Sequence, residues 1–233
     1  MTGLRPMKKL AVFDIDGTIF RSSLVVELVD ALIQEGIFKA SVGKVYAKSY
    51  QRWLEREDDY DKYIADVVSA YLKNIKGVEY KMYSKVANKV IAFHKNRVYK
   101  YTRDLTKELK KKGYFLLAIS HSPNEPVQKF ASELGFDEIY GRMFEIGKTG
   151  KLTGEMMYRD FIDNKGEVIK KVVEKYNLTL KNSIGVGDTE QDIPVFKLVD
   201  NPICFNPNAK LYKHAKKKKW KIVVERKDVI YNL

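Results

Sequence analysis

The sequence predicts an α/β fold, a doubly wound parallel sheet with a helical insertion after its first strand. Short apolar runs without a polar face alternate with segments of helical periodicity, which is typical of strands that are buried on both faces of a parallel sheet. From residue 36 to residue 97 the chain is instead aromatic and charged, with helical spacing and almost no Gly or Pro. A chain of 233 residues can hold one large domain with a smaller inserted one.

Two carboxylates, Asp14 and Asp16, follow the first apolar run, 10–13. Alternation along an extended chain lets both approach one point at the carboxyl end of the strand, where ligands bind in open α/β sheets. Two acids at the end of an apolar strand are costly to hold together unless a cation or a reaction uses them. The alternative is an ordinary strand end followed by an Asp-Gly turn.

The remaining elements follow in order. We expect further helices over 22–35, 101–112, 125–134, 164–176 and 193–199, and strands over 114–119, 183–187, 202–205 and 220–224. The second strand is expected to stop at Ser120, with 121–124 as a loop, and a glycine-containing stretch, 138–158, predicts a small hairpin. These boundaries assign residues 1–20 and 100–233 to the core and residues 21–99 to the insertion.

The formal charge of +13 is large and is compatible with nucleic acid, an anionic membrane surface or an anionic substrate. Lysines cluster over 107–112, 170–175 and 213–221. We interpret the first two clusters as solvated helix faces and the third as a loop before a last strand, rather than as a nucleic-acid surface. The single cysteine, Cys204, and the lack of a signal-peptide core or a membrane-length apolar run lead us to expect a soluble, cytoplasmic protein.

Polar residues that suit a phosphate and a cation follow three of the predicted strands. They are Asp14 and Asp16, then Ser120, then Asp188 with Asp192 four residues later, and Lys165 begins a predicted helix. Carboxylates at one sheet edge suit Mg²⁺, which prefers oxygen ligands, and a lysine and a hydroxyl opposite them suit a phosphate. Taken singly, Ser120 and Asp192 could be helix N-caps and Lys165 a surface lysine.

In this order and spacing, these residues resemble the haloacid dehalogenase (HAD) superfamily of phosphohydrolases. Asp14-Ile15-Asp16-Gly17-Thr18 is similar to the first motif of that family, and Ser120 and Lys165 stand where its second and third motifs place a hydroxyl and a lysine. Gly187-Asp188-Thr189-Glu190-Gln191-Asp192 is similar to the fourth. Together with Lys151-Leu152-Thr153-Gly154 and an insertion between the first two motifs, this resembles subfamily I-B, the phosphoserine-phosphatase-like branch.

The resemblance implies a Rossmann-like sheet with a small helical cap, and Mg²⁺-dependent hydrolysis of a small phosphomonoester through an aspartyl phosphate. Asp14 would be the nucleophile and Asp16 the general acid and base. Asp14, the backbone carbonyl of Asp16, and Asp188 would hold Mg²⁺. Ser120, Thr18 and Lys165 would bind the phosphate. Thr18 would also help to fix the loop, and Asp192 would support Lys165.

The leaving group is where the match is weakest. Phosphoserine phosphatases grip the amino acid with a cap carboxylate and a cap arginine. Glu27 stands one helical turn too late for the carboxylate, and Arg52 and Arg56 precede the helix expected to carry the arginine. His121 replaces the usual glycine after Ser120 and is a candidate substrate contact.

Phosphoserine hydrolysis and phosphoryl transfer to an acceptor alcohol are therefore kept as alternatives. A basic protein without catalytic activity that binds nucleic acid or membrane is a weaker alternative, because such a module has no need of all the motif residues.

Overall fold

The computed structural model describes residues 7–233; residues 1–6 of the predicted core segment lie outside the described part. The strands are β1 (Lys9–Phe13), β2 (Phe115–Pro123), β3 (Glu138–Ile146), β4 (Leu152–Met157), β5 (Thr179–Gly187), β6 (Asn201–Phe205), β7 (Lys221–Arg226) and β8 (Val229–Asn232). The helices are α1 (Leu24–Gln34), α2 (Lys44–Leu54), α3 (Tyr60–Asn74), α4 (Tyr80–His94), α5 (Lys100–Lys111), α6 (Asn124–Glu133), α7 (Arg159–Asp163), α8 (Lys165–Tyr176), α9 (Ile193–Phe196) and α10 (Ala209–Lys218), with 3₁₀ turns η1 (Ala40–Gly43) and η2 (Glu190–Asp192).

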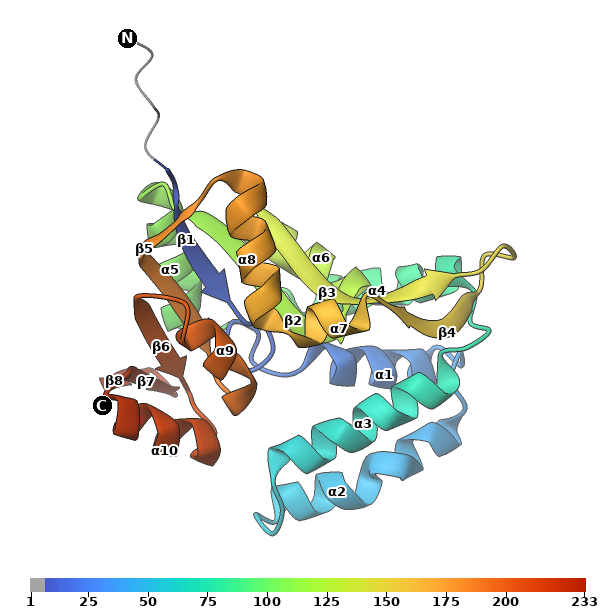
Figure 1. The fold of residues 1–233 in the computed structure, drawn as a ribbon. Coiled ribbons are helices and arrows are strands. Elements are labelled where there is room, and N and C mark those ends of the chain that lie inside the picture. The colour runs from blue at the N-terminus through green and yellow to red at the C-terminus, as the bar shows by residue number, and fades with distance from the viewer. Residues whose placement is uncertain (1–6) are drawn as a thin grey trace.

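All eight strands form one sheet in the order β4-β3-β2-β1-β5-β6-β7-β8 (Figure 1). Strand β1 pairs in parallel with both β2 and β5, so the chain leaves β1 toward one side of the sheet and later returns on the other. This reversal of strand order opens a crevice beyond the carboxyl end of β1, which is the position where open α/β sheets bind ligands. The predicted fold class is confirmed.

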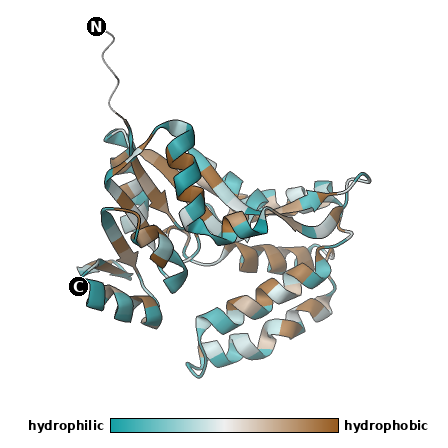
Figure 2. Ribbon diagram, in the orientation of Figure 1, coloured by the Kyte–Doolittle hydropathy of each residue, from teal (hydrophilic) through white to brown (hydrophobic). Residues whose placement is uncertain are grey.

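Alternate residues of the central strands pack on opposite faces of the sheet. Ala11 and Phe13 join a hydrophobic cluster with α5, α6 and the inserted helices, whereas Leu10 and Val12 join a second cluster with α8 and α9. Each of these four residues is at most 1% exposed, and full burial of a large apolar side chain contributes about 1.5–3 kcal/mol. Figure 2 shows the apolar residues concentrated in the strands and the polar residues on the outward sides of the helices.

Helices α1 to α4 occupy the chain between β1 and α5, the region predicted to be an all-helical insertion. Helices α2 and α3 pack side by side at a distance from the sheet, with α1 between them and the strands (Figure 1). Helix α4 instead packs against α6, which covers one face of the sheet. The division of the chain into core and cap at residues 20 and 100 stays a prediction.

The structure has the hairpin predicted over 138–158, because β3 and β4 pair antiparallel. It differs from the predicted elements at the other end of the sheet, at β2 and at two helices. Strand β8, which pairs antiparallel with β7, was not predicted. Strand β2 continues past Ser120 to Pro123, and α9 ends at Phe196 rather than at residue 199. Of the lysine-rich segment 213–221, interpreted as a loop, residues 213–218 form the end of α10, because Asn208 caps that helix and Leu211 and Ala215 anchor it.

Within residues 7–233, no helix has both the length and the hydropathy required to cross a membrane.

Candidate active site

A cavity of about 270 Å³ lies at the crevice beyond β1. The loop that follows β1, the start of α3, the end of β2, the start of α8 and the turn after β5 all contribute to its wall. Of the residues predicted to form a site, Asp14, Asp16, His121, Lys165 and Asp188 line this cavity. The structure therefore brings together side chains that are up to 174 positions apart, from Asp14 to Asp188, in the sequence.

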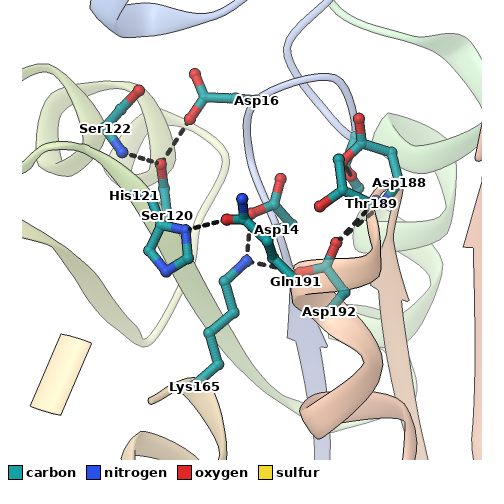
Figure 3. A network of polar contacts seen from close by, with 11 residues as sticks. Asp14, Asp16, Ser120, His121, Ser122, Lys165, Asp188, Thr189, Gln191 and Asp192 are labelled. Atoms are coloured by element: carbon teal, nitrogen blue, oxygen red, sulfur yellow. Dashed lines mark hydrogen bonds and ion pairs between the residues drawn. The ribbon is translucent and has the colours of Figure 1, made fainter. Parts of the chain in front are cut away.

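Lys165 lies between two carboxylates at the bottom of the cavity (Figure 3). Its Nζ atom is 2.6 Å from Asp14 Oδ1 and 2.6 Å from Asp192 Oδ1, and the residue is 3% exposed. The two carboxylates and their hydrogen bonds raise the pKa of Lys165, although burial alone would lower it. A buried ammonium with two charge-assisted hydrogen bonds is thus held in one position and stays charged.

The carboxylate of Asp16 turns toward β2 rather than toward Lys165 (Figure 3). Ser120 Oγ donates to Asp16 Oδ2 at 2.6 Å and accepts from the backbone N–H of Ser122 at 2.9 Å. The backbone N–H of Leu24, the first residue of α1, donates to Asp16 Oδ1. Burial raises the pKa of Asp16, and these hydrogen bonds oppose that rise. Asp16 is therefore a positioned carboxyl group that can hold or release a proton.

The loop after β1 fits closely against the carboxylate of Asp188. Thr18 Oγ1 donates to Asp188 Oδ1 at 3.2 Å. Gly17 has a φ of +74°, and a Cβ atom there would lie 2.1 Å from Asp188 Oδ2, so no larger residue fits without displacing that carboxylate. The Asp-x-Asp-Gly-Thr sequence thus holds a third strand-end carboxylate, that of Asp188, near Asp14.

Burial raises the pKa values of Asp14 and Asp188, and repulsion between the two carboxylates raises the pKa of Asp188 further. A hard cation between them would relieve this repulsion, so the residues present fit Mg²⁺. Among residues 7–233, no group of three or more His, Cys, Asp or Glu side chains is arranged around a metal position. The predicted ligand set instead combines two carboxylates with the backbone carbonyl of Asp16.

Two residues predicted to bind phosphate have other contacts in the structure. The hydroxyls of Thr18 and Ser120 are both hydrogen-bonded to carboxylates, and neither residue is among those that line the cavity. Their observed contacts position Asp188 and Asp16, whereas a direct contact with phosphate stays a prediction. His121 does line the cavity, and its Nδ1 lies 2.7 Å from Gln191 Oε1.

The charged residues considered for the leaving group are paired elsewhere. Glu27 accepts from Arg97 at 2.7 Å and lies 3.0 Å from His94, away from the cavity. Arg52 pairs with the neighbouring acidic residues of the α2–α3 turn, and neither it nor Arg56 lines the cavity. Most of the cap aromatics stack on one another and only Tyr60 reaches the cavity.

The structure adds cavity residues that sequence reasoning missed. Arg142 on β3, Gln191 on η2, and Asp61 and Ile64 on α3 are four of them. Arg142 lies in the stretch predicted only as a small hairpin. Its position beside the cavity depends on the pairing of β3 with β2, which no local sequence pattern predicts.

Gly187, at the end of β5, leaves no space for a side chain beside Asp192. A Cβ atom there would lie 2.3 Å from the Asp192 carboxyl carbon. We expect Gly187→Ala to lower stability by about 1–3 kcal/mol, because the carboxylate that pairs with Lys165 must move. Thermal unfolding measures the loss. In the control, Gly43→Ala, the nearest atom is 3.8 Å away and φ is −60°, so the melting temperature should not fall. Equal melting temperatures for the two variants would contradict this expectation.

Comparisons with known proteins agree with the predicted family. The haloacid dehalogenase-like hydrolase model matches residues 11–197. A phosphoserine phosphatase of Methanocaldococcus jannaschii is 26% identical over 224 residues, covering 95% of this chain and 94% of its own. A histidinol-phosphatase of Neisseria meningitidis is 24% identical over 237 residues, covering 93% of this chain and 99% of its own.

Solved structures show the same fold. The structure of a phospho-aspartyl intermediate analogue of phosphoserine phosphatase superposes with a TM-score of 0.62 at 24% identity, covering 96% of both chains. A protein of unknown function from Bordetella pertussis gives a TM-score of 0.71 at 17% identity, covering 93% of this chain and 98% of its own. Because the family model spans most of the sequence and includes the strand-end residues assembled around the cavity, the chain belongs to the haloacid dehalogenase-like hydrolases.

Proposed function

We propose that this protein hydrolyses a small phosphomonoester in two steps through a phosphorylated Asp14. The observation that carries the proposal is the buried Lys165, which holds Asp14 at 2.6 Å beside the carboxylate of Asp188 in a cavity of about 270 Å³. The predicted phosphatase activity agrees with the relatives, which are named as phosphatases of phosphoserine and of histidinol phosphate.

In the first step, a carboxylate oxygen of Asp14 forms a bond to phosphorus while the bond from phosphorus to the alcohol oxygen breaks. Asp16 gives its proton to the leaving oxygen. In the second step Asp16 takes a proton from a water molecule whose oxygen forms a bond to phosphorus, while the bond from phosphorus to the Asp14 oxygen breaks and inorganic phosphate leaves. The hydrogen bonds from Ser120 and from the Leu24 N–H fix the orientation of Asp16 for both transfers.

Phosphatases of this family generally use Mg²⁺. We propose that the carboxylates of Asp14 and Asp188 and the backbone carbonyl of Asp16 would hold it. When bound, the ion would offset the charge of the carboxylates and of the phosphate, and so let the two anions approach. Thr18 orients Asp188 for this purpose through its hydroxyl.

Lys165 supplies the fixed positive charge on the other side of Asp14. Asp192 holds its ammonium at 2.6 Å and also accepts from the backbone N–H groups of Asp188 and Thr189. A positive charge that is already in place when charge shifts to the phosphoryl oxygens costs no reorganisation during the reaction. Asp192 is thus a positioning residue for Lys165.

The proposal predicts that EDTA abolishes the turnover of p-nitrophenyl phosphate and that added Mg²⁺ restores it, because Asp14 and Asp188 repel an incoming phosphate without a cation. Release of p-nitrophenol measures the rate. In the control sample, Mg²⁺ in excess over EDTA is added before the EDTA, and this sample should keep its full rate. Turnover that persists in EDTA would refute the assigned role of the cation.

The cytoplasmic location stays a prediction.

A further inference from the structure

The half of the cavity that faces away from Lys165 must receive the alcohol part of a substrate. Its wall on the side of α1 and α3 is apolar and consists of Val25, Ile64, Ala65 and Val68. At a volume of about 270 Å³, the whole cavity leaves room for a phosphate and a short alcohol. This wall favours a leaving group with a hydrocarbon body.

Two buried nitrogen atoms among the residues that line the cavity have no hydrogen-bond partner within residues 7–233. They are Arg142 Nε and His121 Nε2. Arg142 Nε carries a hydrogen and can only donate. The other imidazole nitrogen of His121 faces the carbonyl oxygen Gln191 Oε1 at 2.7 Å, so Nδ1 carries the proton and Nε2 is left as an acceptor.

The imidazole of His121 is neutral. Its pKa is lowered to about 4 by burial and by the nearby positive charges of Lys165 and Arg142. Arg142 and His121 both line the main cavity, and both also line a small hollow beside Val25 and Val68. The subsite therefore offers one donor and one acceptor in the same region, a combination that a single hydroxyl group satisfies completely.

The charged groups of this half of the cavity already have partners. Arg142 Nη2 lies 2.8 Å from Asp163 Oδ1, and Asp61 pairs at 3.4 Å with Lys210. Glu27, considered above for an ammonium group, pairs with Arg97. Within residues 7–233, Arg142 and Asp61, two charged residues that line this half, are thus each already paired with an opposite charge.

An ionised leaving group would lose hydration on entering the cavity and would have to compete for counter-charges that are already paired. A carboxylate would in addition be repelled by the acidic residues of the phosphate half. On the basis of the proposed phosphatase function, we infer that the substrate is the phosphomonoester of a short uncharged alcohol, whose second hydroxyl accepts from Arg142 Nε–H and donates to His121 Nε2. Arg142 and His121 then determine specificity.

A series of three-carbon phosphomonoesters tests the inference by changing the polar groups of the leaving alcohol. The probes are 3-hydroxypropyl phosphate, propyl phosphate, 3-aminopropyl phosphate, 3-phosphooxypropanoate and O-phospho-L-serine. We expect kcat/KM for 3-hydroxypropyl phosphate to exceed that for propyl phosphate by about tenfold, the effect of hydrogen bonds that include a charged donor. The three ionised probes should be slower than propyl phosphate.

Variants identify the residues responsible. Arg142→Lys keeps a positive charge for Asp163 but removes the Nε–H donor, and His121→Leu removes the acceptor. In either variant the ratio of kcat/KM between 3-hydroxypropyl and propyl phosphate should fall toward one, by up to about tenfold. Arg159→Lys is the matched control, because Arg159 contacts the same Asp163 at 3.6 Å but is 70% exposed and does not line the cavity. Its ratio should equal that of the native protein.

Faster turnover of any ionised probe than of both uncharged ones overturns the inference. An unchanged ratio in both Arg142→Lys and His121→Leu does so as well, as does turnover of p-nitrophenyl phosphate with neither uncharged aliphatic ester accepted. If p-nitrophenyl phosphate and all five probes resist hydrolysis in the presence of Mg²⁺, the proposed phosphatase function itself is refuted.

Discussion

Asp14→Asn should reduce the turnover of p-nitrophenyl phosphate by at least about 10⁴-fold, because an amide oxygen is a poor nucleophile and no other carboxylate can take its place in line with phosphorus. Asp16 is turned toward Ser120 and Asp188 is held by Thr18, so neither is placed to replace it. The measurement is the steady-state rate at saturating substrate and Mg²⁺.

The fold should survive this substitution. Burial raises the pKa of Asp14, and the charges of Asp192 and Asp16 raise it further, so a neutral group of the same shape removes electrostatic strain. The amide oxygen can still accept from Lys165. We therefore expect a melting temperature within about 3 °C of the native value, which corresponds to about 1 kcal/mol.

The matched control is Asp228→Asn, in an exposed turn between β7 and β8. It makes the same chemical change far from the cavity and should leave both the rate and the melting temperature unaltered. Native turnover in Asp14→Asn would exclude Asp14 as the nucleophile. Loss of activity that is accompanied by unfolding would show a structural role instead.

Lys165→Met should affect stability as well as activity. The substitution leaves the buried carboxylates of Asp14 and Asp192 without the ammonium that lies 2.6 Å from each. Loss of one partner from a buried ion pair costs about 3–5 kcal/mol, or roughly 6–20 °C in melting temperature for a chain of this size. The rate should fall by at least about 10²-fold, because a fixed charge beside the phosphoryl group is lost.

A second substitution separates the two effects. In Lys165→Met/Asp192→Asn, one of the two unpaired carboxylates is neutral, so part of the lost stability should return while the rate stays low. Lys170→Met on the same helix is the control, since Lys170 is 63% exposed and its pair with Glu167 contributes less than about 1 kcal/mol. A melting temperature of Lys165→Met equal to that of Lys170→Met would contradict the assigned role.

The sequence was sufficient to locate the phosphate half of the cavity. Asp14, Asp16 and Asp188 each follow an apolar run, and the carboxyl ends of parallel strands share one edge of the sheet. The proximity of these three residues could therefore be predicted without knowledge of how the helices pack. The helical insertion was likewise predictable, because its spacing of aromatic residues is a local property.

The edge strand β8 shows where local patterns fail. It has four residues and none of them is fully buried, so its short apolar run, 229–231, was not recognised as a strand. Strand β4, at the other edge, has only Leu152 buried, yet its hairpin with β3 was predicted from the glycines of 138–158. Helix α10 was mistaken for a loop because its lysines outnumber the two apolar residues that anchor it.

The sequence by itself therefore determined the family, the sheet and the carboxylates at its edge, because each strand and each motif is a short local run of residues. Only the tertiary structure decided which polar groups find partners. It turned Ser120 toward Asp16, paired Glu27 with Arg97, and placed Arg142 of β3 in the same cavity wall as His121. Such pairings depend on strand order and helix docking, which bring together residues that are distant in sequence and compete for the same charge. No local sequence pattern predicts which of them will pair.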